Sequence, residues 1–243
     1  MTKSNDWPDF TFAYQPIVDV QAGKITSFEA LVRGPENQHA TAVLENVNQS
    51  ARYLFDELLR CRAIELAHQL GINCRLNLNL MPKALAMLDT AIESALEAAD
   101  EIGFGRDLIT LEVTEADIID NVDWFAHCVR RYRAEGVKFA IDDFGKVYAG
   151  FNLIASFMPD SIKVDHNLIR DIEQHKTQQS VVESLSLLCK NLDIDLVAEG
   201  VETQAEFDTC AKLGIKLFQG YLFSRPGFES LPTVDCDQVV RVA

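Results

Sequence analysis

The stretch Lys138-Phe-Ala-Ile-Asp142-Asp143-Phe-Gly145 places two adjacent acids at the end of a short apolar run. The apolar run predicts a buried strand at 137–142. Because polar groups are costly to bury without partners, the two carboxylates need a cation, a proton or a special partner. Four other expected strands carry a polar residue at or near their ends, and these residues are Glu29, Asn79, Glu112 and Glu199. Such a pattern is what a barrel enzyme that holds divalent metal requires.

Strand-like and helix-like segments alternate along nearly the whole chain. Repeated strand–helix units imply parallel strands with right-handed crossovers, and eight or nine units favour a closed barrel over an open sheet. Besides 137–142, the expected strands span residues 10–18, 25–32, 72–80, 109–113, 161–164, 196–198 and 215–218. The expected helices are 41–70 with a break near 49–52, a long alanine-rich helix that Pro82 opens, 122–134, 178–192 and 204–213.

The first two expected strands are separated by Gln21-Ala-Gly23-Lys, which is typical of a hairpin turn. The predicted fold class is therefore α/β, as a modified TIM (β/α)8 barrel with one antiparallel strand near the N-terminus. A chain of 243 residues suits one such barrel. We expect 1–243 to be a single domain with a core at about 10–230. The end of the chain, 232–243, is expected to be a short tail or a final covering element.

The net charge of −15 argues against a general nucleic-acid binder, because no basic field is available to release counterions. No nucleic-acid polymer is therefore expected as a partner. The same charge argues against docking on an anionic membrane surface. It remains compatible with a small phosphate ligand, because a bound metal inverts the local sign of the charge.

Six cysteines occur without a CxxC pair, which is typical of buried, reduced thiols in a cytosolic protein. The N-terminus is polar and lacks the apolar centre of a signal peptide. No apolar run is long enough to span a bilayer. We therefore expect a cytoplasmic protein without a membrane segment.

The period of two along a strand selects among neighbouring polar residues. Asn77 and Asn79 share one face, and Asn79 is the better candidate ligand because it lies nearer the strand's C-terminal end; Asn77 is expected to be a satisfied interior amide. Glu112 is expected to point inward. Carboxylate and amide oxygens suit Mg²⁺ or Mn²⁺ better than zinc. With two metals, Asp142 could bridge them and Asp143 could hold the second, as in phosphodiester cleavage by water.

Several short motifs occur in order along the chain. They are Tyr14-Gln15-Pro16-Ile, Glu29-Ala30-Leu31, Asn79-Leu-Met-Pro82, Glu112-Val-Thr-Glu115, Asp142-Asp143-Phe-Gly145, Ile162-Lys163-Val-Asp165, Ala198-Glu199-Gly-Val-Glu202 and Gln219-Gly220-Tyr221. In these motifs the chain resembles the EAL-domain cyclic di-GMP phosphodiesterases over nearly its whole length. The resemblance implies a cyclic-guanylate-specific phosphodiesterase that opens cyclic di-GMP to linear pGpG with two Mg²⁺ or Mn²⁺ ions per active site.

The resemblance also implies residue roles. One metal would be held by Glu29, Asn79, Glu112 and Asp142, and the second by Asp142 and Asp143. Glu199 resembles the acid that orients metal-linked water and is often assigned as general base, and Lys163 resembles the lysine that contacts this water and the scissile phosphate. The implied substrate contacts are Gln15, Arg33 and Gln219, and the implied supporting residues are Glu115 and Glu202.

Structural alternatives remain open for several of these residues. Lys163 could be a barrel ion-pair lysine, and Arg33 could pair with Glu36. Gln15 and Gln219 could be buried amides. Glu202 could merely cap the helix that begins near Thr203.

One departure from the family pattern follows the aspartate pair. Catalytically active members usually continue with Thr or Ala and then Gly-Tyr-Ser, whereas this chain reads Lys146-Val147-Tyr148-Ala149-Gly150. Val147 replaces a glycine in a loop that the family associates with metal binding and dimer contact. The alternative function is therefore a catalytically weak or inactive EAL-type cyclic di-GMP receptor. A homodimer and a sensor or regulatory partner outside this chain are the other partners that the resemblance implies.

Overall fold

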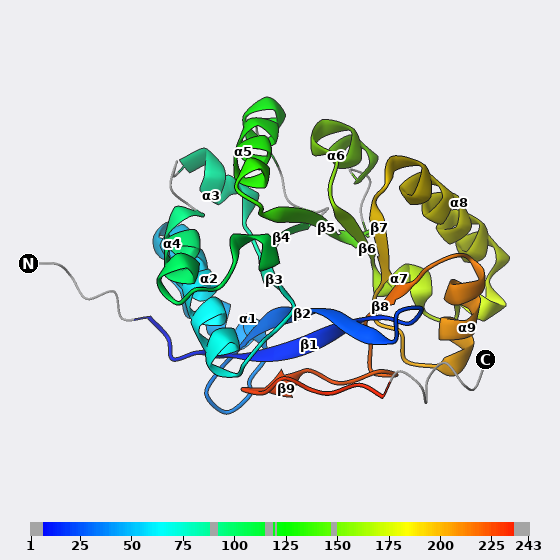
Figure 1. Ribbon diagram of the computed structural model, residues 1–243, viewed down its shortest axis with the longest axis horizontal. Helices are drawn as coiled ribbons and strands as arrows, with labels where there is room; N and C mark the ends of the chain where they lie inside the picture. Colours follow the sequence, from blue (N-terminus) through cyan, green and yellow to red (C-terminus); the bar gives the residue numbers. More distant parts are fainter. Residues whose placement is uncertain (1–6, 88–91, 115–118, 120, 147–149, 236–243) are drawn as a thin grey trace, which may run out of the picture.

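Eight strands in the described part of the chain close into a barrel in which the first strand runs against the others (Figure 1). The computed structural model describes residues 7–87, 92–114, 119, 121–146 and 150–235. The barrel strands in order are β1 (Thr11–Asp19), β2 (Lys24–Arg33), β3 (Arg75–Asn79), β4 (Ile109–Thr114), β5 (Lys138–Phe144), β6 (Ser161–Val164), β7 (Asp195–Ala198) and β8 (Leu217–Phe218). β1 is antiparallel to β2 and β8, and all other neighbours are parallel. The predicted modified TIM barrel is confirmed.

Helices cover the outside of the barrel along most of its strands (Figure 1). The longer ones are α2 (Arg52–Gln69), α4 (Glu93–Glu101), α5 (Val122–Ala134), α6 (Gly150–Phe157), α8 (Lys176–Leu192) and α9 (Gln204–Lys212). The short helices are α1 (Ala40–Leu44), α3 (Pro82–Met87) and α7 (His166–Ile169), and 3-10 turns occur at η1 (Gln49–Ala51), η2 (Arg106–Leu108) and η3 (Ile172–Gln174). No helix among the described residues is long and apolar enough to cross a bilayer.

The helical predictions were partly right. The break expected near 49–52 is present, because Asn48 accepts a hydrogen bond from the Ser50 N–H and starts η1 there. The single long helix expected after Pro82 is wrong, because α3 and α4 are separate helices on either side of 88–91, which lie outside the described residues. α6 and α7 were not predicted.

Alternation along the strands separates two environments. On β5, Phe139 and Ile141 are fully buried and belong to the apolar core, which also contains Phe125 of α5 and Phe157 of α6. The rings of Phe125 and Phe157 meet edge to face at 5.2 Å. The strand residues that alternate with these apolar ones, such as Asp142 after Ile141, point to the polar barrel interior. The sheet therefore packs its apolar face on the helices and leaves its other face for polar groups.

The outer side of β1 is covered by the end of the chain rather than by a helix. β9 (Gly227–Phe228) pairs antiparallel with β1, and Figure 1 shows it outside the barrel beside that strand. The Glu229 N–H donates to the Phe12 carbonyl at 2.9 Å, and the Thr11 hydroxyl donates to the Glu229 carboxylate at 2.6 Å. A hairpin between β1 and β2 supplies no crossover helix, so another segment has to protect this edge. This strand starts upstream of the expected 232–243, whose last residues, 236–243, lie outside the described part.

The start of α9 is held by a capping box. The Thr203 hydroxyl accepts from the Glu206 N–H, and the buried Glu206 carboxylate accepts from the N–H groups of Glu202, Thr203 and Asp171 at 2.9–3.1 Å. Burial raises the pKa of Glu206, but these backbone donors outweigh it, so the pKa lies below its usual 4.5. Thr203 is the N-cap, so the capping role considered for Glu202 is wrong.

Replacing Glu206 by alanine is expected to lower the free energy of unfolding at pH 7 by about 2–3 kcal/mol, because buried backbone donors lose a charged acceptor. Since the folded pKa lies below the unfolded value of 4.5, this stabilisation is present above pH 4.5 and is lost as the pH falls through the folded pKa. Urea unfolding of wild type and variant, repeated from pH 7 downward, measures both effects. Glu183→Ala on the exposed face of α8 is the control, and an equal loss in both variants would contradict the prediction.

Candidate active site

Lys163 stands at the centre of the barrel interior, with its side chain only 1 % exposed. Its Nζ lies 3.0 Å from Glu29 Oε2, 3.1 Å from Glu112 Oε2, 3.0 Å from Asp142 Oδ1 and 2.6 Å from Glu199 Oε1. The acids come from β2, β4, β5 and the residue after β7, while Lys163 lies on β6. Five of the residues expected in the site therefore meet at one point, and Lys163 is indeed an ion-pair lysine in this arrangement.

One lysine cannot balance four acids in so buried a place. Burial raises the pKa of Glu112 to about 8, although Lys163 lowers it, and burial likewise raises the pKa of Glu199. Burial lowers the pKa of Lys163, but the surrounding carboxylates overcome this and raise it well above 10.5. The site is therefore short of positive charge, which is the condition that a bound cation relieves.

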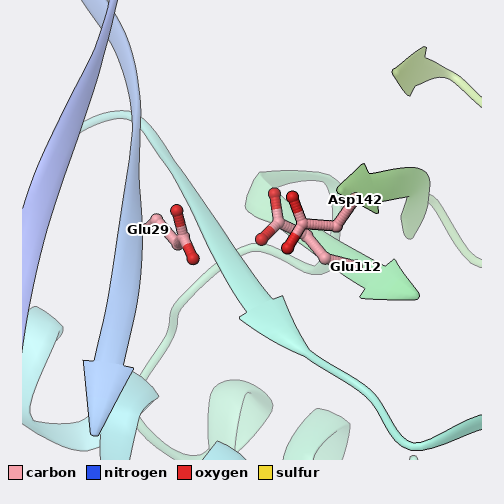
Figure 2. Close-up of side chains that lie close together, drawn as sticks. All are labelled: Glu29, Glu112 and Asp142. Atoms are coloured by element: carbon pink, nitrogen blue, oxygen red, sulfur yellow. The ribbon is translucent and has the colours of Figure 1, made fainter. Parts of the chain in front are cut away.

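The carboxylates form two overlapping groups that fit two cations. Oxygens of Glu29, Glu112 and Asp142 lie within 4.8 Å of one another, and so do oxygens of Asp142, Asp143 and Glu199. Figure 2 shows the carboxylates of the first group directed toward a common space. An all-oxygen donor set at this spacing suits Mg²⁺ or Mn²⁺. Asp142 belongs to both groups, as expected of a bridging ligand, and Glu199 joins the second group.

Two asparagines of β3, Asn77 and Asn79, lie beside this cluster and differ in burial. Asn77 donates from Nδ2 to Glu112 Oε1 at 2.7 Å, which confirms it as a satisfied interior amide. Asn79 lies opposite Glu112 in the register of β3 and β4, and its side chain is exposed at the strand end. Its carbonyl accepts from the Arg60 guanidinium at 3.4 Å. The structure thus places Asn79 beside the first carboxylate group, and its role as a ligand stays a prediction.

Asp143 reaches the site only because the backbone turns at this residue. Successive side chains in a regular strand point to opposite faces, so Asp142 and Asp143 would diverge. Asp143 instead has φ +55°, and the pairing of β5 with β6 shifts register between Ile141 and Phe144. Aspartate tolerates this left-handed conformation better than most residues. The turn places both carboxylates in the second group, and the Asp143 carboxylate also accepts from Lys146 Nζ at 2.8 Å.

A cavity of about 290 Å³ opens beside the cluster. Its lining residues are Gln15, Glu29, His166, Arg170, Glu199, Gly200, Glu202, Glu206, Gln219, Gly220 and Tyr221. Gln219 donates from Nε2 to Glu29 Oε2 at 2.8 Å, while its buried Oε1 has no hydrogen-bond partner among the described residues. Gln15 lies directly opposite Glu29 in the β1–β2 register and donates weakly, at 3.3 Å, to the Ser224 carbonyl. Both amides therefore face the cavity with capacity to bind a polar ligand.

Arg33 lies four residues beyond Glu29 on the same face of β2. Burial lowers the pKa of Arg33, while Tyr221 and Glu29 raise it. Because Tyr221 and Glu29 line the cavity, the Arg33 guanidinium lies near it. The side chain donates to the Val32 carbonyl at 2.9 Å. No ion pair joins Arg33 to Glu36 in the described structure, where Glu36 instead accepts from Gln38. The guanidinium therefore keeps donors for an anionic ligand.

Sequence reasoning missed several residues that line the cavity, chiefly His166, Arg170 and Tyr221. Arg225 stacks over the Tyr221 ring at 4.2 Å and fixes its position. His166 and Tyr221 follow the C-terminal ends of β6 and β8, where barrel sites are built, and this position was the available signal. Glu202 is exposed at the rim. Glu115 and Val147 lie outside the described residues.

The fold and this site define an α/β-barrel protein with two overlapping carboxylate groups that could hold divalent cations at the C-terminal end of its strands. The family model described as the EAL domain matches residues 4–226, and the chain belongs to this family.

Curated relatives match this chain over part of their longer sequences. The blue light- and temperature-regulated antirepressor BluF of Escherichia coli is 30 % identical over 224 residues, which cover 92 % of this chain and 56 % of that protein. The cyclic di-GMP phosphodiesterase NbdA of Pseudomonas aeruginosa is 30 % identical over 240 residues, which cover 94 % of this chain and 30 % of that protein. The chain therefore spans about half or less of the length of these relatives.

Solved structures show the same fold. A standalone versatile EAL protein from Vibrio cholerae O395 in a c-di-GMP bound form is 43 % identical with a TM-score of 0.90, over 95 % of this chain and 97 % of that one. Klebsiella pneumoniae BlrP1 in a manganese/cy-diGMP complex is 37 % identical with a TM-score of 0.87, over 94 % of this chain and 58 % of that one.

Proposed function

We propose that this chain is a metal-dependent phosphodiesterase that hydrolyses cyclic di-GMP to linear pGpG. The observation that carries the proposal is the pair of carboxylate groups that share Asp142 around the buried Lys163. The relative NbdA is named a cyclic di-GMP phosphodiesterase, and the Vibrio and Klebsiella structures contain the cyclic dinucleotide. Similar residues in a similar fold support the same substrate for this chain.

Glu29, Asn79, Glu112 and Asp142 would hold one cation, and Asp142 and Asp143 with Glu199 would hold the other. When bound, Mg²⁺ or Mn²⁺ would polarise the phosphate. The ions would also lower the pKa of a bound water, so that it can attack the phosphate as hydroxide. The Glu199 carboxylate would accept a proton from the attacking water. Lys163 would hold Glu199 in place through its 2.6 Å contact and stabilise negative charge on the phosphoryl oxygens.

Gln15, Arg33 and Gln219 would orient the dinucleotide. Arg33 offers paired N–H groups to a phosphate, and Gln219 offers its unpartnered Oε1 to a donor on the ligand. Water adds across one P–O3′ bond, so the ring opens to a chain with one 5′-phosphate and one free 3′-hydroxyl. Glu202 at the rim and Glu115, which follows β4 in the sequence, are proposed as supporting residues.

Purified protein with Mg²⁺ or Mn²⁺ is expected to convert cyclic di-GMP to pGpG, because the oxygen-only cluster suits these ions. Chromatography of the nucleotides measures the conversion. Ca²⁺ is expected to inhibit, because it accepts longer bonds and looser geometry than Mg²⁺. Absence of pGpG at saturating metal and substrate would overturn the proposal.

A receptor is the second candidate function. The sequence Lys146-Val147 departs from the pattern of catalytically active members, and one relative is named an antirepressor rather than an enzyme. A receptor keeps the binding residues but turns over no substrate. Calorimetry that shows tight binding of cyclic di-GMP, combined with no product at saturating metal, would decide for the receptor.

A homodimer is also proposed. Exposed apolar side chains lie on the first turns of α5 and α6, and these are Val122, Trp124 and Phe151. Exposed large apolar side chains that lie near one another are typical of surfaces that bind other protein chains. Light scattering that gives the mass of one chain at micromolar concentration would overturn the dimer.

The remaining expectations also stay proposals. A cytoplasmic location is supported by the free thiols of the described cysteines, which are Cys61, Cys74, Cys128, Cys189 and Cys210. A single domain over 1–243 and a sensor or regulatory partner outside this chain are proposed with it. Limited proteolysis that yields two stable fragments would overturn the single domain, and labelling by a thiol reagent that cannot enter cells would overturn the location.

A further inference from the structure

Lys146 forms an ion pair with a member of the second carboxylate group. Its Nζ lies 2.8 Å from Asp143 Oδ2, and its N–H donates to the Asp143 carbonyl at 3.2 Å. Asp143 has φ +55° and Gly145 has φ +99°, so the chain between the pair is a tight turn that returns the lysine to the aspartate. The contact is therefore built into the local backbone rather than made by a distant side chain.

The charges of the site show what this contact does. The two overlapping groups contain five carboxylates, which are Glu29, Glu112, Asp142, Asp143 and Glu199. When all five are ionised, Lys163 offsets one negative charge, and two divalent cations would neutralise the remaining four. Lys146 offsets one of the four at Asp143 and leaves the second group with less charge for a cation to neutralise.

The second group is also the more accessible one. The Asp143 side chain is 30 % exposed and that of Lys146 is 48 % exposed, whereas the Glu112 side chain of the first group is fully buried. An exposed ion pair is weak and opens readily. Lys146 can therefore leave Asp143 when a cation arrives, but it opposes that arrival by occupying the carboxylate and by repelling positive charge.

We propose that Lys146 is an internal competitor for the second divalent cation and makes the two cations bind in sequence. The first group fills at low metal concentration, and the second fills only when the metal displaces Lys146 from Asp143. This inference rests on the proposed two-cation phosphodiesterase and adds a residue that sets the metal requirement. Loss of the lysine is expected to tighten the weaker cation site by about three- to tenfold, given the strength of an exposed ion pair and the repulsion between nearby charges.

Manganese binding without substrate tests this directly. Titration of the full chain with Mn²⁺, followed by electron paramagnetic resonance of the free ion, is expected to show a tighter and a weaker site. In Lys146→Ala the weaker site tightens about three- to tenfold, and the tighter site changes less than about twofold. Lys146→Arg keeps the charge and the weak site. Asp143→Asn removes the weaker site, which identifies it.

Two further measurements distinguish competition at Asp143 from an effect of the protein's net charge. Lys190→Ala removes an exposed lysine from α8 and is expected to leave both affinities unchanged. Added salt is expected to narrow the difference between wild type and Lys146→Ala, because screening weakens an exposed ion pair. Equal weaker-site affinities in wild type and Lys146→Ala, or equal tightening in Lys190→Ala, would overturn this inference alone. Absence of manganese binding in every form would overturn the proposed metal-dependent function with it.

Discussion

Lys163→Met is expected to lower the rate of cyclic di-GMP hydrolysis by about 10²- to 10³-fold, the usual effect of removing one group that stabilises charge on the reacting phosphate. Methionine keeps the length and the apolar part of the lysine side chain. The substitution removes the lysine ammonium group, whose Nζ contacts four carboxylates at 2.6–3.1 Å. Initial rates at saturating Mn²⁺ measure the change. A rate within about threefold of wild type would exclude Lys163 from the reaction.

The same variant is expected to be less stable when metal is removed. Breaking a buried ion pair by deleting one partner costs about 3–5 kcal/mol, because the remaining charges stay buried without a counter-ion. Unfolding in urea with a chelator measures this loss, and added Mn²⁺ is expected to recover much of it by supplying positive charge. Lys190→Met on the exposed side of α8 is the matched control and should change neither rate nor stability.

Asp142→Asn is expected to lower turnover by about 10³-fold or more, because one residue serves both carboxylate groups and such groups act as a unit. Both manganese sites should weaken, unlike the single site that Asp143→Asn removes. Nucleotide chromatography and manganese titration measure the two effects. Turnover near that of wild type would refute the shared-ligand assignment.

Asp142→Asn should not destabilise the metal-free protein. The amide keeps the shape of the carboxylate and removes one negative charge from a cluster that has too many. Equal or greater resistance to urea in the presence of a chelator, together with lost turnover, would show that the acid serves the site rather than the fold. Asp193→Asn is the control, because Asp193 has φ +56° at the end of α8, where asparagine is tolerated as well.

The barrel could be predicted because its signals are local and repeated. Apolar runs and helical periods recur along the chain, and the hairpin at Gly23 carries its own turn chemistry. The separation of α3 from α4 was missed, because the many alanines after Pro82 favour helix and outweighed the helix-start pattern Thr90-Ala-Ile-Glu93. β9 was missed because two residues, Gly227 and Phe228, carry no periodic signal and pair only once β1 is in place.

The candidate site shows the same division. The types of its acids and their places at strand ends were predictable from period and motif. That Lys163 would contact Glu29, which is 134 residues away in the sequence, depends on the closure of the barrel. The cavity residues His166 and Tyr221 likewise meet only when the loops after β6 and β8 converge at one rim.

The sequence by itself predicted the barrel and the candidate oxygen donors, since both follow from the spacing of apolar and polar residues along each strand. Only the tertiary structure shows how the adjacent Asp142 and Asp143, which the sequence predicted for one site, can both reach it. A regular strand would send them to opposite faces, and the left-handed turn at Asp143 returns its carboxylate to the cluster. The same turn brings Lys146 back to Asp143. The backbone conformation, and not the order of residues alone, therefore decides which charges lie together.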